Sequence, residues 1–136
     1  MDVTTELKKN IATIASQYHL ELVLLFGSRA RGDVHNNSDV DIAFLSTEEY
    51  DMEKKLTLIA MFEQLFGKSV DLVDLRNASV LLGDRIVRDA VILFGDDKTF
   101  SRVRSRAHIR YMDFQPFFRR QKERLYRHFG VKNVYD

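Results

Sequence analysis

The chain has 136 residues, of which 45% are hydrophobic and 30% are charged, and its net charge at pH 7 is +1. This composition suits one globular domain with one core, and the absence of cysteine excludes disulfides and thiolate metal sites. The apolar runs are far shorter than the ~20 residues that span a bilayer, and no export signal is evident, so we expect a cytoplasmic protein.

The first third of the chain alternates between helical and strand patterns. A helix is predicted over residues 3–18 from apolar residues at intervals of four and three, namely Leu7, Ile11, Ile14 and Tyr18. The short apolar runs 21–26 and 40–45 are typical of buried strands. Residues 46–49, with the sequence STEE, fit a capping box that would open the next helix.

The middle of the chain continues the alternation. The predicted second helix ends at Gly67, and its apolar positions are Met52, Leu56, Ile59 and Phe66. We expect a third strand at residues 69–75, a helix that begins at Asn77 or Ser79, and a fourth strand at residues 91–94. Strands that alternate with helices predict an α/β sheet covered by helices.

The end of the chain differs in charge from the rest. Residues 98–136 carry 11 Lys and Arg but 3 Asp and Glu, whereas residues 1–97 carry 10 basic and 17 acidic residues. Apolar residues spaced by about seven predict one long helix or two, with Pro116 as the point of division or kinking. We therefore expect a single domain over residues 1–136, with a core at about 1–97 and a C-terminal helical arm at about 98–130.

A Gly-Ser pair directly follows the first predicted strand. Gly27 and Ser28 leave backbone N–H groups free to meet a phosphate, and Arg29 and Arg31 are close enough in sequence to add charge-assisted contacts. A tight turn without any ligand would use the same two residues.

Two aspartates begin the second predicted strand. Strand alternation puts Asp39 and Asp41 on one face, where two carboxylates 4 Å apart repel each other by about 4 kcal/mol at an effective dielectric near 20. Either one carboxylate takes up a proton or a divalent cation binds between them, and oxygen ligands favour Mg²⁺. A pair of solvated turn aspartates is the alternative.

A third carboxylate occurs in the third predicted strand. Asp71 has apolar neighbours on both sides, so we expect it to have a partner, because an unpaired buried charge is costly. Asp74 is the competing residue, but its position is typical of a strand end. If Asp71 lies beside Asp39 and Asp41, the three carboxylates can hold two metal ions about 3.5–4 Å apart.

The combined spacing of these motifs resembles a known signature. FGS at 26–28, a gap of ten residues, DVDI at 39–42 and VDL at 70–72 resemble the polymerase-β-like nucleotidyltransferase superfamily, and RARG at 29–32 is most similar to its minimal nucleotidyltransferases, the MNT proteins. The resemblance implies a mixed sheet of about four or five strands flanked by helices, and transfer of a nucleotide from ATP with two Mg²⁺ ions. By this resemblance the catalytic and metal-binding residues are Asp39, Asp41 and Asp71, and the nucleotide-binding residues are Gly27, Ser28, Arg29, Arg31 and Ser38.

The resemblance also implies a partner. MNT proteins commonly pair with HEPN proteins in toxin–antitoxin modules, so we expect an antitoxin that transfers AMP to a tyrosine of a HEPN ribonuclease toxin and neutralises it in a hetero-oligomer. The basic arm would dock this partner through Arg119, Arg120, Lys122 and Arg124. A small-molecule adenylyltransferase of the aminoglycoside-modifying kind and an antitoxin that acts by binding alone remain alternatives, and the arm could instead contact RNA.

Overall fold

The computed structural model describes residues 3–32 and 39–130, which form four helices and four strands. In chain order these are α1 (Thr5–Gln17), β1 (Leu20–Phe26), β2 (Val40–Ser46), α2 (Met52–Phe66), β3 (Val70–Asp74), α3 (Val80–Asp89), β4 (Val91–Phe94) and α4 (Asp97–Phe129). Each element lies close to the residues that the apolar pattern predicted.

The strands form one mixed sheet in the order β3-β2-β1-β4. β1 pairs with β2 and with β4 in the antiparallel sense, whereas β2 and β3 are parallel. The expected α/β fold with a mixed sheet is therefore confirmed, with four strands in the part of the chain that the structure describes.

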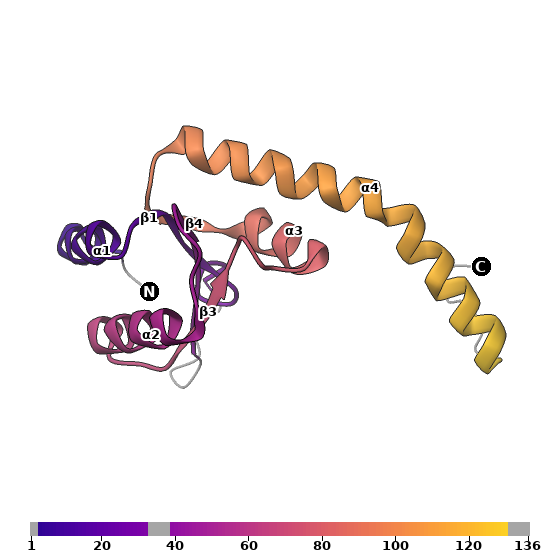
Figure 1. Ribbon diagram of the computed structural model, residues 1–136, viewed down its shortest axis with the longest axis horizontal. Coiled ribbons are helices and arrows are strands. Elements are labelled where there is room, and N and C mark those ends of the chain that lie inside the picture. Colours follow the sequence, from indigo (N-terminus) through magenta and orange to yellow (C-terminus); the bar gives the residue numbers. More distant parts are fainter. Residues whose placement is uncertain (1–2, 33–38, 131–136) are drawn as a thin grey trace.

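Helices cover both faces of the sheet (Figure 1). α1 and α2 pack on one face around a core that includes Ile11, Phe44 and Phe62. α3 and the first part of α4 lie against the other face, where Leu22 and Ile86 belong to a second, smaller core. Since both faces are covered, the central strand β1 is apolar on both sides, which explains its continuous hydrophobic run.

The helix starts show where local sequence reasoning succeeded and where it was wrong. α3 begins after Ser79, one of the two residues predicted to start this helix. The Ser79 side chain accepts a hydrogen bond from the Leu82 N–H. α2, however, is capped by Asp51, whose Oδ1 accepts from the Lys54 N–H at 2.8 Å, and not by residues 46–49. Ser46 instead extends β2, and its hydroxyl accepts from the Glu48 N–H at 3.0 Å.

The fully buried residues of α2 are not among the apolar positions from which the helix was predicted. Leu58 and Phe62 are fully buried, whereas Met52 and Leu56 are 69% and 58% exposed. Apolar residues occur on several sides of this helix, so the spacing alone could not identify the side that meets the sheet. The predicted end of the helix is confirmed, because Gly67 adopts a left-handed conformation with φ of 66°.

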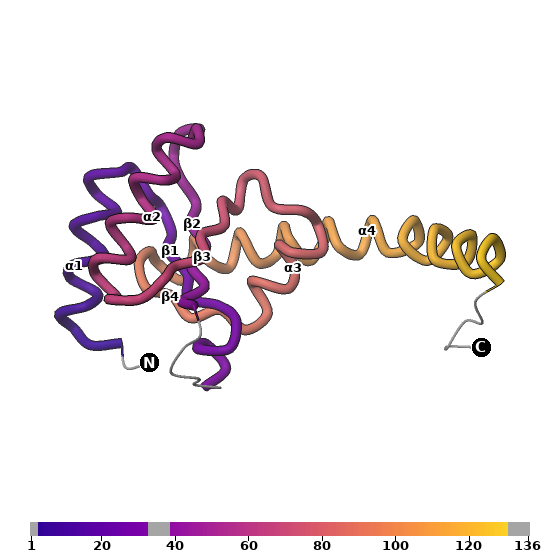
Figure 2. Tube along the Cα trace, turned by 90° about the horizontal axis from the view of Figure 1, so that it is seen from below, coloured from indigo at the N-terminus to yellow at the C-terminus, as the bar shows by residue number. Residues whose placement is uncertain are grey.

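α4 is one helix of 33 residues with Pro116 inside it, so the prediction that left open one helix or two resolves to one. Phe100 and Val103, in its first turns, pack against the second core. Further along, the helix extends away from the sheet and the other helices, as Figure 2 shows. No described helix combines the length and the apolar character needed to cross a membrane.

Candidate active site

The sheet register brings the predicted aspartates together. Asp41 in β2 is the direct register partner of Asp71 in the parallel strand β3. Directly paired residues project from the same face of a sheet, and Asp39, two residues before Asp41, belongs to that face as well. Asp39 and Asp71 are exposed and Asp41 is half-buried, so the carboxylates lie at an accessible edge of the site.

The Gly-Ser turn lies against the same carboxylate. Phe26, the last residue of β1, is the register partner of Asp41, and Gly27 follows it with φ of 76°. A Cβ atom at Gly27 would overlap the Asp41 carboxylate. Glycine is therefore required here both by the left-handed backbone and by the close approach of the acid. The next residues form a turn in which the Arg31 N–H donates to the Gly27 carbonyl oxygen at 3.3 Å.

The electrostatics of Asp41 show that these groups act on one another. Burial raises the pKa of the Asp41 carboxyl, and the negative charges of Asp71 and Asp39 raise it further. Arg29 and Arg31 oppose this shift without cancelling it. The charged form of this half-buried carboxyl is therefore destabilised. A cation bound beside it would stabilise that charged form.

The two arginines of the turn have different environments. Arg29 is 6% exposed and lies inside the protein, whereas Arg31 is exposed to solvent. Both are charged neighbours of Asp41, and each lowers the pKa of its carboxyl. Ser28 is half-buried in the turn, and Ser38 lies outside the described residues.

The register of β2 and β3 favours Asp71 over Asp74 as a site residue, although our reason for preferring Asp71 was wrong. Asp71 is exposed, so it carries no burial cost that would demand a partner. Asp74 is the buried residue, and its carboxylate accepts hydrogen bonds from the Arg76 N–H and the Asn77 side-chain amide, each at 3.0 Å. Asp74 therefore shapes the loop after β3, and Asp71 lies beside Asp41.

The donor set fits Mg²⁺ in its chemistry. It consists of carboxylates alone, and their mutual repulsion raises the pKa of Asp41, a cost that a divalent cation would relieve. Among residues 3–32 and 39–130, no three acidic or histidine side chains are already placed together as ligands of a metal ion. The carboxylates are neighbours, and they do not form a completed metal centre.

Sequence reasoning missed a second group of charged residues on the same face of the sheet. Four arginines line a cavity beside the ends of β2 and β3, namely Arg76, Arg102, Arg106 and Arg110. The last three follow one another at intervals of four, so they share one side of a helix. This spacing was visible in the sequence and could have identified them.

Comparison with known proteins identifies the class. Residues 9–99 match the family described as polymerase beta, nucleotidyltransferase. The match covers most of the chain and includes the Gly-Ser turn and the three aspartates. This chain belongs to that nucleotidyltransferase family.

Individual relatives lie within the same class. The chain is 39% identical over 85 residues to the protein adenylyltransferase MntA of Shewanella oneidensis, covering 60% of this chain and 61% of that protein. It is 31% identical over 86 residues to the protein adenylyltransferase MntA of Aphanizomenon flos-aquae, covering 56% of this chain and 57% of that protein. The chain thus spans about three fifths of the length of these curated relatives.

A solved structure extends the similarity over more of the fold. One chain of a toxin–antitoxin crystal structure with AMP-PNP superposes with a TM-score of 0.79 at 28% identity, covering 87% of this chain and 97% of that chain. This match covers 87% of this chain, whereas the family match covers residues 9–99.

Proposed function

We propose that this protein is a cytoplasmic antitoxin nucleotidyltransferase that transfers AMP from ATP to a tyrosine hydroxyl of a HEPN ribonuclease toxin. The observation that carries this proposal is the sheet register, which pairs Asp41 with Asp71 next to the Gly27 turn. The similarity to MntA adenylyltransferases and to a toxin–antitoxin structure with AMP-PNP supports the choice of reaction and partner.

In the proposed reaction, the tyrosine oxygen attacks the α-phosphorus of ATP in line with the leaving group. The bond between the α-phosphorus and the bridging oxygen breaks, pyrophosphate leaves, and the tyrosine proton passes to solvent or to a carboxylate. Little covalent chemistry falls to the protein, so positioning and neutralisation of charge supply most of the rate.

The residues divide this work between them. Asp39 and Asp41 would hold two Mg²⁺ ions, with Asp71 completing the site on the acceptor side. Bound Mg²⁺ would supply neutralisation of the phosphate charge and a lower pKa for the attacking hydroxyl. Backbone N–H groups at Gly27 and Ser28 would bind the β- and γ-phosphates, together with the turn's arginines and Ser38.

The main contact with the toxin would lie outside the catalytic site, on the helical arm of the single domain. The far part of α4 extends from the sheet with exposed apolar side chains, including Phe114 and Phe117, which are 44% and 45% exposed. Basic residues accompany them at Arg119 and Arg120. An exposed face that combines aromatic and basic groups is suited to a protein partner.

The test is a transfer assay that combines the protein with a HEPN toxin. With α-labelled ATP and Mg²⁺, we expect label on the toxin, and its loss when the toxin's acceptor tyrosine is replaced by phenylalanine. The Asp39→Ala, Asp41→Ala double variant should abolish labelling, while a Glu6→Ala, Glu53→Ala double variant, at exposed positions of α1 and α2, serves as a matched control.

Two results would contradict the proposal. Label that never appears on the toxin, under conditions where the complex forms, would exclude the transfer reaction. Neutralisation of the toxin by the Asp39→Ala, Asp41→Ala variant at wild-type strength would show that binding alone is sufficient.

A further inference from the structure

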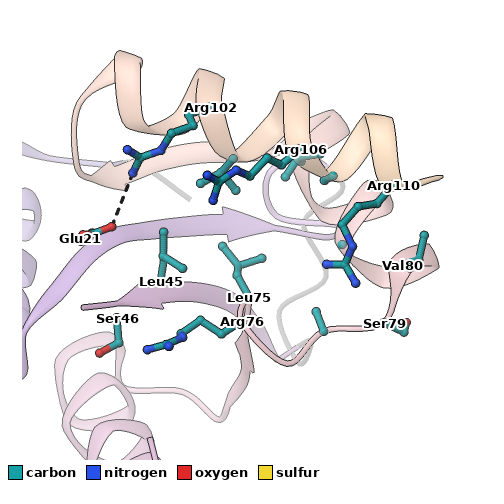
Figure 3. A pocket seen from close by; sticks show the side chains of 15 residues that line it. Glu21, Leu45, Ser46, Leu75, Arg76, Ser79, Val80, Arg102, Arg106 and Arg110 are labelled. Atoms are coloured by element: carbon teal, nitrogen blue, oxygen red, sulfur yellow. Dashed lines mark ion pairs between the residues drawn. The ribbon is translucent and has the colours of Figure 1, made fainter. Parts of the chain in front are cut away.

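A cavity of about 400 Å³ lies between α3, α4 and the sheet (Figure 3). Its floor is formed by Leu45 and Leu75 at the ends of β2 and β3, and its walls by residues of the two helices. This volume is within the range of pockets that hold small molecules. The cavity is therefore large enough for a compact organic ligand.

The walls of the cavity are strongly basic. Arg102, Arg106 and Arg110 extend from α4 toward the sheet, and Arg76 comes from the loop after β3. Glu21 is the one acidic residue among those that line the cavity, and its carboxylate lies 3.8 Å from the Arg102 guanidinium. Arg76, Arg106 and Arg110 form no ion pair with any described residue.

Three other arginines of the same helices have a charged or aromatic partner. Arg88 pairs with Asp84 at 2.8 Å, Arg127 lies 3.9 Å from Glu123, and the Arg104 guanidinium lies 5.3 Å from the centre of the Phe100 ring. A helix face that served only to remain solvated would not require three positive charges around one concave, largely apolar floor. Like charges so arranged repel one another, and an anion would relieve that cost.

The start of α3 adds to the attraction for an anion. Ser79 and Val80, at the N-terminus of this ten-residue helix, line the cavity, and the first turn contains no acidic residue. Unpaired N–H groups and the helix dipole favour negative charge at such a position. A phosphate held by the arginines would therefore lie near a second source of positive potential.

The cavity is separate from the Gly27 turn but shares its face of the sheet. Leu45 follows Asp41 by four residues, as Leu75 follows Asp71, so each pair projects on one face about 13 Å apart along the strand. The Gly27 turn lies at the Asp41 end. Phosphates bound at the turn would lie toward the other end of these strands from the arginines.

We infer that this cavity binds a nucleoside monophosphate unit, with the phosphate between the arginines and the nucleoside on the apolar floor. Inorganic phosphate alone would leave that floor uncovered, whereas a nucleoside phosphate matches both the charge and the volume. The unit has two sources, free AMP or an AMP group already attached to a protein. The second source depends on the proposed function, and the first does not.

Photocrosslinking tests the inference without any transfer reaction. The probe is 8-azido-AMP in the presence of EDTA, and the labelled peptides are to be mapped by mass spectrometry. Label is expected in residues 75–87 or 102–110. The Arg106→Ala, Arg110→Ala variant should bind the probe at least ~10-fold more weakly, because two charge-assisted contacts are lost.

Matched variants keep the result specific. The Lys8→Ala, Lys9→Ala variant removes the same charge from α1, outside the cavity and outside the proposed toxin surface, and should bind within about twofold of wild type. Circular dichroism confirms that each variant is folded, and Arg76→Ala, on the opposite wall, provides an independent loss of binding. Label confined to residues 27–31, or equal affinities in all variants, would overturn the inference.

A competition arm separates the two sources. If AMP displaces the probe but a peptide with an AMP-modified tyrosine does not, the natural ligand of the cavity is free AMP. If the modified peptide displaces the probe more strongly, the natural ligand is an AMP group attached to a protein. If neither competes but a short single-stranded RNA does so through the same arginines, the cavity belongs to an RNA surface and the inference is wrong. A failed transfer assay with intact AMP binding would refute the proposed function alone.

Discussion

The sheet and the far half of α4 differ in whether their apolar side chains are buried or exposed. In the sheet and α2, large side chains such as Phe44 and Phe62 are fully buried. No residue of α4 is buried, and Phe117, Leu125 and Phe129 are between 45% and 67% exposed. The first region holds the fold together and fixes the carboxylates, whereas the second contributes little to folding and is available for contact with other molecules.

This contrast teaches that the two regions tolerate different changes. A packed core loses stability when volume is removed, and an exposed helix loses binding when charge or apolar surface is altered.

Removing one phenylalanine from each region should give very different changes in the free energy of unfolding. Phe62→Ala leaves a cavity in the main core and should destabilise the protein by about 3–5 kcal/mol. Phe117→Ala on α4 should change stability by no more than about 0.5 kcal/mol. Urea denaturation followed by circular dichroism measures both, and equal losses would mean that the far half of α4 is part of the folding unit.

Removing a carboxylate from each region should separate catalysis from surface charge. We expect Asp71→Asn to lower the rate of AMP transfer by about 100- to 1,000-fold, the cost of losing one preorganised charged group at the reacting centre. Asp113→Asn, at an exposed position in the part of α4 where the toxin is proposed to bind, should leave the rate unchanged once the toxin is saturating. Single-turnover labelling of the toxin gives both rates. Retention of full activity by the Asp71 variant would remove it from the site.

Charge reversal should affect partner binding only when it is made on α4. The Arg119→Glu, Arg120→Glu variant is expected to weaken the complex with the toxin by about 10-fold and to reduce its salt dependence. Lys8→Glu with Lys9→Glu on α1 makes the same change in net charge and should have little effect. Calorimetric titration at two salt concentrations measures the difference, and unchanged affinity would exclude this part of α4 from the interface.

The smallest effect should appear in the pH dependence of stability. Because the pKa of Asp41 is raised in the folded state, the protein gains stability from this residue below the unfolded pKa and loses it as the pH rises through the folded value. Asp41→Asn should therefore raise the melting temperature at pH 7 without metal, and the gain should vanish at a pH below 3.8, the ordinary value for aspartate. A variant less stable than wild type at pH 7 would contradict this explanation.

Particular residues show how far the sequence could be followed. The spacing of DVDI and VDL predicted that Asp41 and Asp71 belong to strands, and the parallel register of β2 and β3 then places them side by side. We expected Asp71 to be buried because its sequence neighbours are apolar, but it is exposed. Neighbours along the sequence do not reveal which side of an edge strand faces solvent. Sequence reasoning also misplaced the cap of α2, where Asp51 competes with an equally plausible Ser46.

The sequence by itself determined the elements, their order and the candidate site residues, because hydrophobic period, glycine positions and motif spacing are local properties. Tertiary structure alone decided the sheet register, the burial of Arg29 and Asp74 and the exposure of the far half of α4. It also assembled the arginine cavity from α4 and the loop after β3. These features depend on contacts between segments that are distant in the chain, and a local sequence pattern does not specify which distant segments will meet.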